Sequence, residues 1–206
     1  MTGRRLLGFA AAVFVSHHVP SFAGDTAGDW IDLLTPFAVV GTAALVFRSV
    51  DVRGLPLALA FIAALLYVDG HGIHLAANSI GHEHPTGDVR RVTHFWDEEW
   101  GHFEWHLGLF ALVGALCLAA RGAAVSMRTG VVAAALLGWT FFTSTVEGGT
   151  WWLELAAAAV FVLWALRSRR PLLTTCAAAF ALGALLIGIW AAWHGGVPQF
   201  SQVGWL

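Results

Sequence analysis

The chain has no lysine, and only 12% of its 206 residues are charged. A soluble domain usually carries about 25% charged residues, so this composition argues against one. The missing lysine also excludes a retinal-type Schiff base, which needs a lysine amine. Only two cysteines are present, Cys117 and Cys176, and both lie in apolar stretches. They provide neither a disulfide framework nor a cysteine zinc site, and we expect both to pack as small core residues.

Hydrophobic residues make up 58% of the chain, and the mean hydropathy is +0.71. Because a helix needs about 20 apolar residues to cross a bilayer, the sequence predicts an all-α fold. We expect one domain over residues 1–206, a polytopic transmembrane bundle of about seven helices. The expected spans are residues 5–22, 30–47, 55–78, 94–120, 129–145, 151–166 and 172–193.

The arginines predict how the helices are oriented in the cell membrane. If the N-terminus is cytoplasmic, nine of the 11 basic residues lie on the cytoplasmic side, as the positive-inside rule requires, and the C-terminus lies outside. The first span ends in a sequence that resembles a signal-peptide cleavage site, but His17, His18 and Pro20 favour a retained helix. The net charge of −2 gives no indication of nucleic-acid binding.

This orientation gathers the polar residues in the extracytoplasmic half of the membrane. All 10 histidines fall there, and so do nearly all acidic residues, with Asp51 as the exception. Because the orientation was derived from the arginines alone, the clustering of histidines and acids on one side is an independent observation. Ionisable groups inside a membrane are costly and usually mark a functional site, so we expect a site that opens to the outside.

The densest polar segment covers residues 94–106. At 100° per residue, four of its side chains form one slanted stripe on a helix: His94, Glu98, His102 and His106. Asp97 and Glu104 share a flanking face. On the preceding span, His71, His74 and Asn78 fall on a common face. The polar residues 79–93 between the two helices are expected to form a loop.

Imidazole and carboxylate groups without cysteine suit zinc, and also iron or copper. We therefore predict a metal site, with Glu98 or Asp97 as the catalytic base. The candidate metal ligands are His71, His74, His94, His102, His106 and His194. The spacing of His102 and His106 lets both rings reach one ion from adjacent turns.

The run from His74 to Asn78, followed by His94, Asp97-Glu98 and the 101–106 segment, resembles the seven-helix membrane metal hydrolases that include alkaline ceramidases and progestin/adiponectin-type receptors. The resemblance matches His74 or His82 to the family's first histidine and Asp97 to its acid. It implies a zinc-bound water that attacks a lipid amide or ester. In that family the His-x-x-x-His motif lies on the last helix, whereas here it follows Asp97.

The function predicted from these patterns is a membrane zinc hydrolase that acts on a small apolar, lipid-like substrate among the membrane lipids. Three alternatives remain at this point. A dinuclear iron or copper oxygenase would use the same ligand types. A haem electron carrier would need facing histidines, such as His74 and His106. A metal or proton transporter would need polar residues through the inner half of the membrane, and almost none are present. The oligomeric state is left open.

Overall fold

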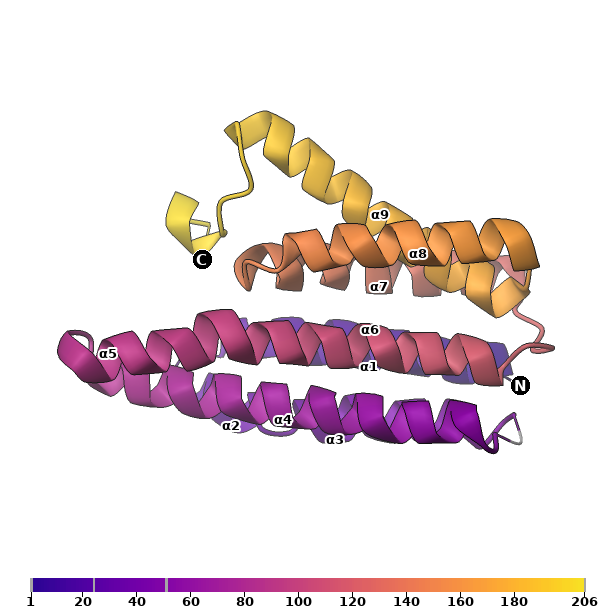
Figure 1. Ribbon diagram of the computed structural model, residues 1–206, viewed down its shortest axis with the longest axis horizontal. Coiled ribbons are helices and arrows are strands. Elements are labelled where there is room, and N and C mark those ends of the chain that lie inside the picture. Colours follow the sequence, from indigo (N-terminus) through magenta and orange to yellow (C-terminus); the bar gives the residue numbers. More distant parts are fainter. Residues whose placement is uncertain (1, 24, 51, 206) are drawn as a thin grey trace.

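The computed structural model describes residues 2–23, 25–50 and 52–205, apart from the side chains of residues 25 and 26. Asp51, the acid expected in the inner half, lies outside the described residues. All regular structure in the described part is helical (Figure 1). The elements are α1 (Thr2–Phe22), α2 (Asp25–Asp32), α3 (Thr35–Phe47), α4 (Leu55–Glu83), α5 (Gly87–His94), η1 (Phe95–Gly101), α6 (His102–Ala119), α7 (Met127–Glu147), α8 (Trp151–Ser168), α9 (Pro171–His194) and η2 (Ser201–Val203).

Within the described residues, six helical stretches are long and apolar enough to cross a membrane, which makes this a multi-pass membrane protein. They are Ala27–Phe47, Leu55–Glu83, Gly87–Ala119, Met127–Glu147, Trp151–Ser168 and Pro171–His194. The all-α bundle is thus confirmed, and the expected number of about seven is close. The predicted helix at residues 5–22 forms as part of α1, but its arginines and histidines lower its hydropathy, so it is not among the six.

The expectation of a loop over residues 79–93 was wrong for most of its length. Helix α4 continues to Glu83, and α5 begins at Gly87. The residue before a proline is disfavoured in the helical conformation, and α4 ends next to His84, directly before Pro85. Polar side chains at this end do not prevent helix formation, because the backbone hydrogen bonds continue along α4.

Helices α4 and α6 run side by side along the bundle (Figure 1). A Cβ atom added at Gly70 of α4 would lie 2.3 Å from the backbone nitrogen of Trp105, and one at Gly108 of α6 would lie 2.3 Å from the backbone nitrogen of Tyr67. Small residues let helix backbones approach closely in membranes. These two glycines therefore set the distance between the helices that carry the site described below.

Most buried side chains of the bundle are apolar, and much of its exterior is apolar too. Cys117 and Cys176 are both buried in the core, as predicted. Large hydrophobic side chains such as Phe61 on α4 and Leu163 on α8 are more than half exposed. Extensive exposed apolar surface marks an interaction surface, and on helices of this length it suits contact with lipid. Helix α9 crosses the bundle obliquely, and the segment after it returns toward the other helices (Figure 1).

Candidate metal centre

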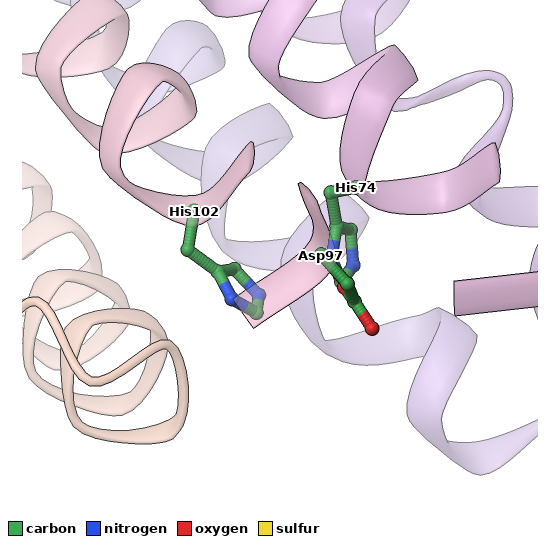
Figure 2. A group of neighbouring side chains, drawn as sticks. All are labelled: His74, Asp97 and His102. Carbon is green, nitrogen blue, oxygen red and sulfur yellow. The ribbon is translucent and has the colours of Figure 1, made fainter. Parts of the chain in front are cut away.

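Three side chains from three helical segments converge at one point: His74 of α4, Asp97 of η1 and His102, the first residue of α6. One ligand atom from each residue lies within 4.8 Å of those of the other two. Asp97 and His102 are buried, and His74 is partly buried. Figure 2 shows His74 against Asp97, with the His102 ring directed toward them. We call these three residues the ligand triad.

The contacts within the ligand triad fit a metal ion. His74 Nδ1 lies 2.6 Å from Asp97 Oδ1, and the His74 and His102 rings have their centroids 4.3 Å apart. His102 Nδ1 is buried without a hydrogen-bond partner. Buried polar atoms are nearly always satisfied, and a bound cation would satisfy this one. The set of two imidazoles and one carboxylate is also a common one for zinc and non-haem iron.

The π-helical segment η1 aligns Asp97 with His102. In a regular α-helix, five residues at about 100° each would place these two side chains about 140° apart. A π-helix bonds residue i to i+5, so that residues five apart lie one turn from each other. In this arrangement Asp97 contacts His74 of α4. Such π segments occur frequently at functional sites.

Glycines make room for the ligand triad. A Cβ atom at Gly101 would lie 3.0 Å from the backbone nitrogen of His74, so this glycine allows η1 to approach α4 closely. A Cβ atom at Gly148, just after α7, would lie 2.9 Å from both His102 Cγ and His106 Cε1. The two imidazole rings thus occupy space that a side chain at position 148 would fill.

The indole of Trp105 lies at the centre of a wider group of histidines. Its ring centroid is between 4.9 and 5.8 Å from those of five imidazoles, His17, His71, His74, His102 and His106. Two of these histidines are held by side chains outside the ligand triad. His71 Nε2 is 3.1 Å from Asp32 Oδ1, and His106 Nδ1 is 2.6 Å from Thr150 Oγ1.

A cavity of about 410 Å³ opens beside the ligand triad. Pockets that hold small molecules commonly measure about 300–1,000 Å³. Its polar lining includes His74, His102 and Glu98 among other residues, and six Phe or Trp side chains also line it. The aromatic lining residues are Phe22, Trp105, Trp139, Phe142, Phe200 and Trp205. The arrangement suits a ligand with a polar group near the triad and an apolar remainder.

The segment after α9 contacts the edge of this cavity. The Gln199 side-chain amide donates to Glu98 Oε2 at 3.1 Å and also to the backbone carbonyl of Glu147. The backbone N–H of Ser201 donates to Glu147 Oε2 at 3.2 Å. Glu98 Oε2 is itself 3.7 Å from His102 Nδ1. The C-terminal segment therefore holds the Glu98 carboxylate beside the ligand triad.

The predicted site residues thus divide into two groups. The structure brings together His74, Asp97 and His102, with Glu98 at 3.7 Å from His102. The other predicted ligands lie outside the ligand triad. His71 pairs with Asp32, and His106 with Thr150. His94 is exposed, and His194 packs against Trp190 on α9 with a centroid distance of 4.0 Å.

Three partners in this region were missing from the predicted site: Asp32, Thr150 and Gln199. Each lies outside α4, η1 and α6, and each forms a hydrogen bond to a residue near the ligand triad. Asp32 bonds to His71, Thr150 to His106 and Gln199 to Glu98. Only Asp32 carried a signal in the sequence, as an acid in the expected outer half of the membrane. Thr150 and Gln199 are ordinary polar residues near helix ends.

Comparisons with family models, with curated proteins and with solved structures found no match for this chain.

Alanine at Gly148 should disturb the ligand triad directly. Its Cβ atom would press on His102 and His106 at 2.9 Å, so we expect Gly148→Ala to weaken metal binding by about 10-fold, as changes next to metal ligands commonly do. Titration of the purified protein with zinc measures this. Gly188→Ala is the matched control, because nothing lies within 4 Å of its added Cβ. Equal affinities for the two variants would contradict this account of Gly148.

Proposed function

We propose that this protein is a membrane-embedded, metal-dependent hydrolase whose substrate is a lipid-like ester or amide. The observation that carries the proposal is the ligand triad of His74, Asp97 and His102 beside a cavity that six Phe and Trp side chains help to line. Hydrolytic zinc sites commonly use three protein ligands and leave the fourth position for water. The sequence resemblance to seven-helix membrane metal hydrolases is in keeping with this proposal.

The chemistry divides between the metal and the side chains around it. A bound zinc ion would lower the pKa of its water to about 7 and polarise a carbonyl group. Two imidazoles and one carboxylate hold the ion in the proposal. The Asp97 carboxylate also accepts a hydrogen bond from His74 Nδ1, which fixes the orientation of that ring.

Glu98 is placed to act as the general base. Its carboxylate lines the cavity, and its Oε2 atom lies 3.7 Å from His102 Nδ1. In hydrolysis, Glu98 takes a proton from the attacking water, the water oxygen bonds to the acyl carbon, and the acyl C–O or C–N bond breaks. Glu98 then returns the proton to the leaving oxygen or nitrogen. Gln199 donates to Glu98 Oε2 and holds the carboxylate in place.

The lining of the cavity favours an apolar substrate. Phe22, Trp139 and Trp205 line the cavity and are each partly exposed at the surface, so an acyl chain would meet aromatic rings between the ligand triad and the exterior. The arginine distribution supports an extracytoplasmic position for this end of the bundle. A lipid in the outer leaflet would then have a short path to the site.

The test combines metal analysis with hydrolysis of p-nitrophenyl esters of increasing acyl length by detergent-purified protein. We expect about one zinc ion per chain and hydrolysis that depends on it. Glu98→Gln should lower kcat by about 10²- to 10⁴-fold, the usual contribution of a general base, and should leave the zinc content unchanged. Glu99→Gln is the control, because Glu99 is exposed and lines no described pocket. Full activity in Glu98→Gln would rule out Glu98 as the base.

The donor set also favours a second candidate, an iron-dependent oxygenase. Two histidines and one carboxylate with open positions form the ligand set of many non-haem Fe(II) oxygenases, and the ligand triad has this composition. The same metal analysis separates the candidates. Iron in place of zinc, with oxygen consumption and no ester hydrolysis, would replace the hydrolase by the oxygenase. A Soret band in the purified protein would indicate haem and exclude both.

A further inference from the structure

Glu154 is a buried carboxylic acid to which the proposed metal centre gives no role. It lies on α8 within the membrane-spanning stretch Trp151–Ser168, and its exposed fraction is 0%. Neither of its carboxylate oxygens has a hydrogen-bond partner. An ionisable residue inside the membrane is costly, and such residues commonly mark functional positions.

The space around this carboxyl group is created by glycine. A Cβ atom added at Gly183 of α9 would lie 2.4 Å from Glu154 Oε1 and 3.3 Å from the carbonyl oxygen of Gly138 on α7. The carboxyl group therefore occupies a gap where α7, α8 and α9 meet, and the backbones of two neighbouring helices form its walls. A side chain at position 183 would fill this gap.

No charged group in the described residues compensates Glu154. The titratable residues on the helices packed around it are Arg128 and Glu147 on α7, Arg167 on α8, Cys176 and His194 on α9, and His102, Glu104, His106 and Cys117 on α6, with Arg121 just after α6. None of them forms a hydrogen bond or ion pair with Glu154. An isolated carboxylate in a low-dielectric interior costs far more than a neutral acid, so uptake of a proton would remove most of this cost.

We propose that Glu154 is a proton-binding site within the membrane, separate from the ligand triad. Its ligand is a single proton, taken up from water by the carboxylate to give the neutral acid, and released to water when the contact with α9 loosens. The site is formed by Glu154, Gly138 and Gly183, on helices that contribute no member of the triad. The proposal therefore does not depend on the hydrolase function.

Infrared difference spectroscopy of the full-length protein tests this site, because the C=O stretch of a neutral carboxylic acid is separate from the amide bands. We expect wild type to show such a band, Glu154→Gln to lack it, and the exposed control Glu83→Gln to keep it. In wild type the band should shift on transfer to D₂O and should disappear reversibly as the pH rises from about 5 to about 10, with the helix content unchanged.

Two results would overturn the proposal. If Glu154→Gln has the same carboxylic-acid bands as wild type, Glu154 is ionised. If the band is lost in Glu154→Gln but neither exchanges in D₂O nor responds to pH before the wild-type protein unfolds, the residue is a fixed neutral acid and not a proton site. Gly183→Ala provides a second variant should Glu154→Gln not fold. Its Cβ would displace the carboxyl group, so the band should change frequency, and an unchanged band would also contradict the proposal.

Discussion

Protein carrying His102→Ala should bind metal at least about 100-fold more weakly than wild type. His102 contributes one of the three converging ligand atoms. Loss of a residue that only hydrogen-bonds to a metal ligand already lowers the metal affinity by about 10- to 100-fold, so loss of a ligand should lower it by more. The measurement is a zinc titration of metal-stripped protein in detergent, followed by elemental analysis. His74→Ala should give a loss of the same size.

Two further histidines serve as controls for this prediction. His94→Ala removes an exposed imidazole outside the ligand triad and should leave the affinity unchanged. His106→Ala distinguishes the ligand triad from the ligand pair that the sequence suggested, in which His102 and His106 bind one ion. Because His106 bonds to Thr150 instead, its loss should weaken binding by only about 10-fold. Equal losses in His102→Ala and His106→Ala would support the pair in place of the triad.

Gly70→Ala should strongly destabilise the protein, whereas Gly72→Ala should not. The new methyl group at position 70 would lie 2.3 Å from the backbone nitrogen of Trp105, a contact that forces α4 and α6 apart. Overpacking of this kind typically lowers the free energy of unfolding by about 1–3 kcal/mol. At Gly72 nothing lies within 4 Å of the added atom, and alanine in a helix interior is favoured over glycine by about 0.5–1 kcal/mol.

Thermal unfolding in detergent measures both variants on the same helix, two residues apart. We expect a lower Tm for Gly70→Ala and an unchanged or higher Tm for Gly72→Ala. Metal affinity should follow the same order, because α4 carries His74 and the adjoining helix begins with His102. If Gly70→Ala is as stable as wild type, the close approach of the two helices does not set the geometry of the site.

The helices could be predicted from the sequence because each membrane span needs a continuous apolar stretch. The expected spans at 129–145 and 151–166 differ from α7 and α8 by no more than two residues at each end. The prediction was wrong for residues 79–93, where polar side chains were taken to indicate a loop. Residues such as Ser79 and His82 lie beyond the apolar part of α4, yet they continue its helix.

The ligand triad could be predicted only in part. Its members were all among the candidate residues, because histidine and carboxylate are rare in apolar helices. Their grouping was not predictable, since it depends on the π-helical segment η1. A regular period of 100° per residue separates Asp97 from His102, and no residue type in this segment signals the change of helix. The contacts of His71 and His106 depend on α2 and on the start of α8, and helical periodicity gives no information about these.

The close pairing of α4 with α6 has a consequence for biosynthesis. The ligand triad extends only from His74 to His102, and both flanking helices lie between Leu55 and Ala119. Contacts between segments near in sequence form early in folding. All three ligands are therefore synthesised before α7 to α9 are translated. They lie on the helical hairpin of α4 and α6, whose close approach depends on glycine. The later helices enclose the centre and complete its cavity, but they add no member to the triad.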